Sequence, residues 1–431
     1  MSIFGVIGKP ISHSKSPDLM NLYFRLSWQT GFYLRLALNN IGELRKFFEL
    51  LKLKGVNVTS PFKEDAFSFV DKVSEEAKWA NAVNTIVVNE SGESSGYNTD
   101  FSGVKYVFDR YNVSVKDKRA VVIGLGGAGK VCARVLKDEG GEVTVVNRTL
   151  EKARNFALQE GCSYVPIDHL EDVVKEVDIV ISALPRGVDL IKEEWLRPGQ
   201  VFMDANYGVS PLKNVAKEKG CVVFDSLYWL VGQSIPAFEM FTGRKINTDE
   251  VSFSEVLKGK DFDAIAIIGF MLSGKTAVGR VLADRLGWEF VDLDATIEAR
   301  AGKKIRDIFE QDGEEKFRLA ESEILRRTIG RKKVVSCGGG VVIQRENREL
   351  LKRKCFNIWL LCSVDEALKR KTSDDRPLLN VEDTRKRAYE IFKSRIEFYA
   401  DVSDIVILNE GKNLSEVVER LYEEIRIALI S

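Results

Sequence analysis

The residues best suited to chemistry are those at 269–276, G-F-M-L-S-G-K-T, which have the pattern G-x-x-x-x-G-K-T. An apolar run at 264–268 precedes them, and a helical pattern at 277–286 follows. A buried strand, a glycine loop and a helix N-terminus in that order form a cradle for phosphate, because backbone N–H groups face the anion. This context favours a nucleoside-triphosphate site over an ordinary glycine turn.

Two side chains of this loop have expected partners. Lys275 is expected to reach the β- and γ-phosphates, and Thr276 to place its hydroxyl on Mg²⁺. The residues expected to bind ATP in the loop are Gly269, Ser273, Gly274, Lys275 and Thr276.

A second glycine loop lies in the middle of the chain, where residues 124–129 have the pattern G-x-G-x-x-G. It follows an apolar run at 119–124 and precedes a predicted helix at 130–140 and a predicted strand at 142–146. This order predicts a dinucleotide-binding unit. A phosphate loop of the first kind is excluded, because Val131 stands where a serine or threonine would bind Mg²⁺. The expected cofactor-binding residues are Gly124, Gly126, Gly127, Ala128 and Gly129.

The end of the next predicted strand indicates which dinucleotide binds. Sites for NAD carry an acidic residue there for the ribose 2′-hydroxyl. Here the chain has Asn147, Arg148 and Thr149. A guanidinium and a hydroxyl would bind a 2′-phosphate, which an acid would repel. The sequence therefore predicts NADP(H).

Composition sets broad limits. At 431 residues the chain is expected to form two or three domains. Its 64 basic residues balance 64 acidic ones, so we expect neither nucleic-acid nor membrane partners. No signal peptide, no membrane span and no paired cysteine motif is recognisable, which predicts a cytoplasmic protein with free thiols. Two histidines are too few for a His-rich metal site. The oligomeric state stays open.

The first hundred residues alternate predicted strands and helices and contain four polar motifs. These are H-S-x-S-P at 13–17, N-V-T-x-P-F-K at 57–63, A-V-N-T at 82–85 and G-x-N-T-D at 96–100. Taken singly, each has an ordinary interpretation as a turn, a helix cap or a surface lysine. In this order they resemble the substrate domain of shikimate dehydrogenase over most of residues 1–104.

That resemblance implies a site for a shikimate-like ligand and a catalytic pair, Lys63 and Asp100. An ammonium beside a carboxylate can supply the proton that a ring ketone needs on reduction. The residues implied to hold substrate are Ser14, Ser16, Thr59, Asn84, Asp100, Tyr207 and Gln233.

The middle of the chain extends the resemblance. Further predicted strands at 177–182, 201–205 and 221–224 indicate a doubly wound sheet. The residues D-A-N-Y at 204–207, with Pro211 and Leu212 after them, resemble the D-x-x-Y-x-P segment of the family. A helix near 230–243 is expected to pack back on the first domain. One departure lies at 182–184, S-A-L, where the family often has an asparagine or threonine cluster beside the nicotinamide.

Beyond the phosphate loop, five patterns follow in order: D-x-D at 292–294, F-R-x-x-E at 317–321, G-G-G at 338–340, R-P-L-L at 376–379 and R-x-x-x-Y at 395–399. We expect the two acids to alternate on a strand and so to face one site. Together these patterns resemble shikimate kinase along residues 263–431.

This second resemblance implies roles for the matching residues. Asp292 would support the hydrated Mg²⁺ beside Thr276, and Asp294 would orient the attacking hydroxyl. Arg318, steadied by Glu321, and Arg395 would bind the shikimate carboxylate. Arg376 would lie on a lid over ATP. The residues implied to lie against the ring are Gly338, Gly339 and Gly340.

The predicted fold class is α/β. A dehydrogenase, with an α/β substrate domain at 1–104 completed by the helix near 230–243 and a Rossmann-type NADP domain at 105–258, precedes a P-loop domain at 262–431. The resemblance implies that this last domain is similar to nucleoside-monophosphate kinases. The predicted activities are NADPH-dependent reduction of 3-dehydroshikimate and ATP-dependent phosphorylation of shikimate. Two alternatives stay open: a metabolite-sensing regulator that has lost the chemistry, and an NAD-dependent quinate/shikimate dehydrogenase.

Overall fold

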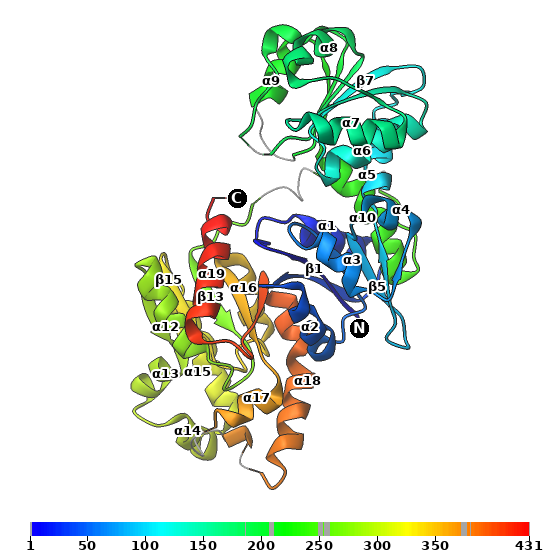
Figure 1. Ribbon diagram of the computed structural model, residues 1–431. Coiled ribbons are helices and arrows are strands. Elements are labelled where there is room, and N and C mark those ends of the chain that lie inside the picture. Colours follow the sequence, from blue (N-terminus) through cyan, green and yellow to red (C-terminus); the bar gives the residue numbers. More distant parts are fainter. Residues whose placement is uncertain are drawn as a thin grey trace. The chain divides into compact units, whose positions relative to one another are not determined.

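The computed structural model describes residues 2–185, 187–206, 211–248, 253, 259–371, 377–379 and 381–430. The chain forms two compact units (Figure 1). Unit one combines residues 1–62 with residues 249–431, and unit two contains residues 63–248. These units cut across the predicted domains, because the first strands of the predicted substrate domain join the sheet of the P-loop domain. The division into three functional domains stays a prediction.

The sheet of unit one has the strand order β14-β15-β13-β16-β17-β2-β1-β3, and every neighbouring pair is parallel. All five residues of β13 are buried, as expected for an apolar strand between two neighbours in a parallel sheet. The strands are β1 (Ser2–Gly8), β2 (Gly31–Ala37), β3 (Gly55–Val58), β13 (Ala264–Ile268), β14 (Glu289–Asp292), β15 (Lys333–Ser336), β16 (Cys355–Leu361) and β17 (Ile405–Leu408).

Helices connect these parallel strands, and three of them bring site residues to the sheet. They are α12, which follows the phosphate loop, α15, which carries Arg318, and α18, which carries Arg395. The helices of unit one are α1 (Ser16–Leu26), η1 (Ile41–Glu43), α2 (Leu44–Leu51), α12 (Lys275–Leu286), α13 (Leu293–Ala301), α14 (Ile305–Gln311), α15 (Gly313–Thr328), α16 (Arg345–Lys354), α17 (Val364–Lys369), η4 (Pro377–Leu379), α18 (Thr384–Val402) and α19 (Leu414–Ala428).

The pairing of β17 with β2 makes one sheet out of strands from the two ends of the chain. Val406 pairs with Leu36, and Ile407 with Ala37. An unpaired strand edge exposes backbone N–H and C=O groups, and this pairing removes one edge from each set of strands. The ion pair between Lys412 and Glu43, 2.9 Å long with both side chains largely buried, adds a contact at the same junction.

Unit two contains a second parallel sheet, with the order β12-β11-β10-β7-β8-β9. Alternate residues of β7 belong to separate apolar clusters: Ala120 and Val122 to one, Val121 and Ile123 to the other. The sheet is therefore buried on both faces, as in doubly wound folds. Its strands are β7 (Arg119–Ile123), β8 (Glu142–Val146), β9 (Ser163–Tyr164), β10 (Ile179–Ser182), β11 (Val201–Asp204) and β12 (Val222–Phe224).

The other elements of unit two surround this sheet or precede it. A small β4-β6-β5 group comes from the predicted substrate domain. These elements are α3 (Lys63–Phe69), β4 (Lys72–Val73), α4 (Glu75–Ala80), β5 (Thr85–Val88), β6 (Ser94–Tyr97), α5 (Asp100–Arg110), α6 (Gly127–Asp138), α7 (Leu150–Glu160), η2 (Ile167–His169), α8 (Leu170–Glu176), η3 (Glu193–Trp195), α9 (Pro211–Glu218) and α10 (Leu227–Thr242).

Two glycines allow α5 and α10 to pack closely. A Cβ atom added to Gly103 would lie 2.4 Å from the Trp229 ring, and one added to Gly232 would lie 2.4 Å from Cβ of Tyr106. Only glycine therefore fits at either position. The close crossing places Gln233, the residue after Gly232, beside the start of β5.

No helix in the described ranges is both long and apolar enough to cross a membrane. All six cysteines are free thiols.

Candidate functional site

The phosphate loop lies between β13 and α12. Gly269 has φ +141°, and a Cβ added there would lie 2.5 Å from the Leu360 carbonyl oxygen. Gly274 has φ +91° and precedes the first residue of α12, Lys275. Only glycine adopts such backbone angles without strain, so these two positions require it. The Lys275 ammonium donates to the Phe270 carbonyl oxygen at 2.8 Å, within its own loop.

A buried hydroxyl in the loop also favours a phosphate ligand. Oγ of Ser273 is buried and has no hydrogen-bond partner among the described residues. A buried hydroxyl without a partner is costly, and a phosphate oxygen in the loop would satisfy it. ATP therefore fits the residues present.

Three oxygens gather where β13, β14 and β15 end. The Thr276 hydroxyl donates to Oδ2 of Asp292 at 2.7 Å and lies 3.4 Å from Oγ of Ser336. Oxygen ligands of this kind suit Mg²⁺. The donor set fits the predicted metal.

The expected strand geometry of the D-x-D pattern is wrong. Strand β14 ends at Asp292, whose carboxylate caps α13 by accepting from the Ala295 N–H at 3.1 Å. Asp294 therefore lies in the first turn of a helix, because an aspartate cap satisfies the free N–H groups there and starts the helix at once. The two acids separate: Asp292 contacts Thr276, and Asp294 lines a neighbouring pocket.

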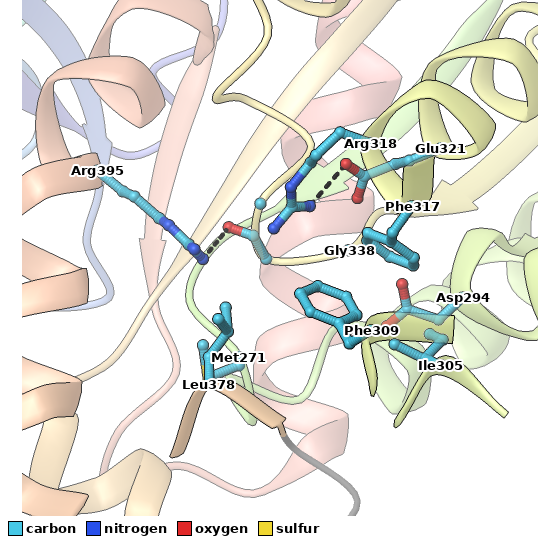
Figure 2. A pocket seen from close by; sticks show the side chains of 12 residues that line it. Met271, Asp294, Ile305, Phe309, Phe317, Arg318, Glu321, Gly338, Leu378 and Arg395 are labelled. Carbon is cyan, nitrogen blue, oxygen red and sulfur yellow. Dashed lines mark hydrogen bonds and ion pairs between the residues drawn. The ribbon is translucent and has the colours of Figure 1, made fainter. Parts of the chain in front are cut away.

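This pocket, which encloses about 470 Å³ including its open mouth, has a polar and an apolar part (Figure 2). Figure 2 shows Arg395 to the left of the Phe309 ring, Arg318 above it and Asp294 to its right. Its apolar walls with a few convergent charged groups suit a small polar molecule. The lining residues are Met271, Asp294, Ile305, Phe309, Phe317, Arg318, Glu321, Gly338, Gly339, Gly340, Leu378 and Arg395.

Arg318 is held in the pocket wall by two carboxylates. Its Nη1 lies 2.7 Å from Glu321, which is fully buried, and its Nη2 lies 3.0 Å from Glu314. Burial lowers the pKa of Arg318, but Glu321 and Glu314 outweigh that effect and raise it overall. Burial raises the pKa of the Glu321 carboxyl, and Arg318 opposes the rise. The predicted i,i+3 pair is confirmed, and it fixes a permanent cation at the pocket.

Arg395 and Tyr399 lie one turn apart on α18 and bind the same atom. The Arg395 guanidinium donates to the Gly339 carbonyl oxygen at 3.1 Å, and the Tyr399 hydroxyl donates to it at 2.5 Å. Burial raises the pKa of Tyr399 to about 12, so the phenol stays a donor. A Cβ added to Gly340 would lie 2.4 Å from both terminal nitrogens of Arg318. The glycine run thus lies between the two guanidinium groups with no room for a side chain at Gly340.

In unit two, the first residues of two helices meet. Nζ of Lys63, at the start of α3, lies 2.6 Å from Oδ2 of Asp100, at the start of α5. The Lys63 side chain is one-third exposed, so the pair is open to a ligand. Thr99 occupies the cap position of α5, and Asp100 begins the helix. The carboxylate is therefore available to Lys63.

Asn84 and Gln233 lie within the same unit. Asn84 accepts from the Thr99 N–H at 2.8 Å, and its amide lies 3.4 Å from Oε1 of Gln233. Strand β5 begins only at Thr85, which leaves Asn84 just before the strand. The structure thus brings together four predicted residues of the substrate site: Lys63, Asn84, Asp100 and Gln233.

Three other predicted substrate residues lie in unit one. Ser14 is buried in the loop between β1 and α1, and Ser16 is the first residue of α1. The Ser16 N–H donates to Oγ of Ser14 at 3.3 Å. Thr59 directly follows β3 and donates its N–H to the Ile7 carbonyl oxygen at 2.9 Å.

The dinucleotide loop has the glycine geometry that its pattern requires. Gly124 has φ +94°, and a Cβ on Gly129 would lie 1.8 Å from the Gly124 carbonyl oxygen. A Cβ on Gly126 or Gly127 would meet nothing within 4 Å, so that side of the loop is open to a pyrophosphate. The loop and the N-terminus of α6 therefore fit the cofactor.

The strand end that selects the cofactor is close to this loop. Asn147 accepts from the Leu125 N–H at 3.2 Å. Arg148 and Thr149 are exposed, so both can reach a 2′-phosphate.

Comparison with known proteins matches these sites to two families. The family model for the shikimate dehydrogenase substrate binding domain matches residues 6–86, and the one for shikimate / quinate 5-dehydrogenase matches residues 106–203. The chain is 35% identical to the NADP(+) shikimate dehydrogenase of Aquifex aeolicus over 252 residues, which are 57% of this chain and 92% of that protein.

The chain belongs to the shikimate dehydrogenase family. The NADP(+) enzyme of Pyrococcus furiosus is also 35% identical, over 56% of this chain and 91% of that protein. The crystal structure of the Aquifex aeolicus enzyme has a TM-score of 0.53 at 33% identity and covers 57% of this chain and 94% of its own. That of the Thermus thermophilus enzyme with NADP(H) and shikimate has a TM-score of 0.52 at 30% identity, covering 57% and 95%.

The rest of the chain carries a second family. The shikimate kinase model matches residues 271–426, so a shikimate kinase domain follows the dehydrogenase. The expected fusion of the two families is confirmed.

Two predicted residues, Tyr207 and Arg376, lie outside the described residues. The departure from the dehydrogenase family at 182–184 leaves backbone groups beside the dinucleotide loop: a Cβ on Gly124 would lie 2.7 Å from the Ala183 carbonyl oxygen. Asn206 binds the Leu184 carbonyl oxygen at 2.8 Å and holds this segment.

Several residues at the sites were not predicted. Glu314 stands four residues before Arg318, so helical spacing alone marks it as a partner. Arg370 and Asn409 both donate to the Ser273 carbonyl oxygen, at 3.2 Å and 2.6 Å, and brace the phosphate loop. No sequence signal links these two to residue 273, because the fold alone brings them together.

Proposed function

We propose that this chain catalyses two consecutive reactions: reduction of 3-dehydroshikimate to shikimate with NADPH, and phosphorylation of shikimate to shikimate 3-phosphate with ATP. Membership of the dehydrogenase family and the kinase domain support both activities. The observation that carries the proposal is the pocket beside the phosphate loop, which holds two arginines and an aspartate around a small cavity. Such a pocket suits a hydroxylated ring acid, the product of the first reaction.

For the reduction, we assign proton transfer to the pair of Lys63 and Asp100. NADPH, when bound at residues 124–129, supplies the hydride to the ring carbonyl. The carbonyl oxygen then gains negative charge, and the Lys63 ammonium donates a proton to it. Asp100, 2.6 Å from Nζ, keeps the amine positioned. Asn84 and Gln233 are adjacent donors and acceptors for ring hydroxyls, and Ser14, Ser16, Thr59 and Tyr207 are assigned to the same ligand.

The cofactor preference follows from charge. Arg148 is exposed at the end of β8, with no acid in the position that binds a ribose 2′-hydroxyl. Its guanidinium can form charge-assisted hydrogen bonds to a 2′-phosphate. We therefore propose NADP(H) rather than NAD(H), which disfavours the NAD-dependent quinate/shikimate alternative.

For the phosphorylation, we assign the carboxylate of shikimate to Arg318 and Arg395. The Arg395 guanidinium contacts the Gly339 carbonyl oxygen, and the Arg318 guanidinium lies against Gly340. The ring would then extend past Phe309 toward Asp294, which orients the attacking hydroxyl and accepts its proton. Lys275 and Thr276 belong to the phosphate loop, and Arg376 is assigned to ATP. Thr276 and Asp292 would hold Mg²⁺, which would neutralise charge on the phosphates.

The regulatory alternative predicts ligand binding without turnover. Two contacts support turnover instead: Lys63 lies 2.6 Å from Asp100, and the Thr276 hydroxyl lies 2.7 Å from Asp292. A coupled assay decides between the two. The chain is incubated with 3-dehydroshikimate, NADPH, ATP and Mg²⁺, and the products are identified by mass.

Shikimate 3-phosphate is expected, with one NADP⁺ and one ADP formed per molecule. Without ATP the product should stop at shikimate. Binding of both ligands with neither product would overturn the proposal in favour of a regulator.

A further inference from the structure

A buried ion pair of the kinase domain faces the substrate loop of the dehydrogenase. Arg420 and Glu424 lie one turn apart on α19, 2.5 Å from each other, with side chains only 1% and 0% exposed. Neither residue lines the kinase pocket. Arg420 donates to the Gly8 carbonyl oxygen at 3.1 Å. The pair therefore contacts the end of β1, the first strand of the chain, and does not line the kinase pocket.

The Glu424 carboxylate accepts hydrogen bonds from consecutive backbone groups of that loop. The Ile11 N–H lies 3.0 Å from each of its oxygens, and the Ser12 N–H lies 2.7 Å from Oε2. The Ser12 hydroxyl donates to the Glu424 carbonyl oxygen at 2.7 Å. Hydrogen bonds to an ionised group are roughly twice as strong as neutral ones, so this carboxylate is a firm anchor for residues 11–12.

The anchored residues directly precede the serines assigned to substrate. The Ser14 N–H donates to the Ile11 carbonyl oxygen at 3.0 Å, which links Ser14 to the anchored turn. On its other side, Arg35 of β2 donates to the Ser14 carbonyl oxygen at 3.0 and 2.7 Å. Side chains from both the dehydrogenase part and the kinase domain thus hold the loop.

We propose that Glu424 of the kinase domain is a positioning residue for the dehydrogenase, because it fixes the loop that presents Ser14 and Ser16 to 3-dehydroshikimate. The proposal rests on the proposed reductase function and on these serines binding substrate. Affinity for the reductase substrate then depends on a helix that belongs to the second enzyme. Hydride and proton transfer do not depend on it, because Lys63 and Asp100 make none of these contacts.

The test compares steady-state constants of the full chain and its Glu424→Gln variant. Glutamine keeps the shape but replaces one acceptor oxygen with a donor and removes the charge. KM for 3-dehydroshikimate should rise roughly tenfold, as expected for the loss of a charge-assisted hydrogen bond. The kcat of reduction, KM for NADPH and both kinase constants should stay within about twofold, a change too small to mark a lost contact.

The matched control is Glu419→Gln, on the same helix. Glu419 pairs with Arg285 of α12 and is half exposed, so the substitution removes a charge from α19 without touching the loop. It should leave every constant unchanged. If the two glutamine variants behave alike, the positioning role is wrong.

Two further variants keep the test decisive if Glu424→Gln folds poorly. Ser12→Ala removes only the hydroxyl contact to α19 and should raise KM for 3-dehydroshikimate about threefold, with no effect on the kinase. In a double-mutant cycle, Glu424→Gln should raise KM much less in a Ser14→Ala background than in the native chain. Independent, multiplicative effects in that cycle would contradict positioning through Ser14.

The outcomes separate this proposal from the function on which it rests. A native chain that does not reduce 3-dehydroshikimate with NADPH overturns both. A native chain that does so, with unchanged KM in folded Glu424→Gln and Ser12→Ala, overturns the positioning role alone.

Discussion

Substitution of Gly340 with alanine should damage shikimate binding at the kinase site while the rest of the chain works normally. The added Cβ would lie 2.4 Å from both terminal nitrogens of Arg318, well inside contact distance. The guanidinium must therefore move by about 1 Å to restore van der Waals contact. A displacement of that size takes the 2.7 Å contact with Glu321 beyond hydrogen-bond range.

Two costs follow from that displacement. Glu321 is fully buried, and breaking such a pair costs about 3–5 kcal/mol when one charge is left alone. The fold can avoid this cost only by holding Arg318 in place and forcing the glycine loop outward, into the pocket. Either way the carboxylate-binding geometry is lost, and a misplacement of about 1 Å can cost on the order of 10²-fold.

The assay is kinase turnover as a function of shikimate and of ATP separately. KM for shikimate should rise on the order of 10²-fold for Gly340→Ala, with KM for ATP little changed. Gly330→Ala is the control, because its Cβ would lie 3.7 Å from the Lys333 side chain and 4.0 Å from the Thr328 carbonyl oxygen, which are ordinary contacts. A normal KM for shikimate in folded Gly340→Ala would refute the assignment of Arg318 to the substrate.

Three further substitutions test the other assignments. Lys63→Ala should lower kcat of reduction by roughly 10²–10⁴-fold, with a smaller effect on KM for 3-dehydroshikimate. The control Lys78→Ala, in a surface ion pair on α4, should leave kcat unchanged. A near-normal kcat in Lys63→Ala would exclude Lys63 as the proton donor. Arg148→Ala should weaken NADPH binding by about 1.5–3 kcal/mol and NADH binding hardly at all. The control Arg154→Ala, at an exposed position of α7, should affect the binding of neither cofactor. Equal losses for both cofactors would contradict the 2′-phosphate contact. Asp294→Asn should reduce kinase turnover on the order of 10²-fold or more, while ATP binding and reductase activity stay intact. Shikimate should then accumulate in the coupled assay. A parallel fall in reductase activity would show that the two sites are not independent.

Much of the site could be predicted because it is local. The phosphate loop and the dinucleotide loop are each built by consecutive residues, and glycines at fixed spacing decide their backbone angles. Arg318 and Glu321 are neighbours on any helix, so their pairing also follows from spacing. The prediction failed where two local rules competed. The strand pattern predicted that Asp292 and Asp294 alternate on a strand, but Asp292 caps a helix that begins at the next residue.

The rest depended on contacts between distant segments. Lys63 and Asp100 begin separate helices, and only the arrangement of those helices brings their charges to 2.6 Å. Arg395 reaches Gly339 across 56 residues of sequence, and Arg370 and Asn409 reach Ser273 across still longer separations. The sequence indicated Lys63, Asp100 and Arg395 only through the family resemblance, and it gave no sign of Arg370 and Asn409.

The sequence by itself determined two families, their order and the chemistry of each loop, because motif spacing and strand–loop–helix context are properties of short segments. Only the tertiary structure decided that β17 pairs with β2, which places the first 62 residues in one compact unit with the kinase domain. It also decided that Glu424 holds Ile11 and Ser12. The sequence could not predict either contact. A strand edge can pair with any compatible strand, and a buried carboxylate can accept a hydrogen bond from any nearby N–H group. The folded chain alone decides which partner is close enough to satisfy them.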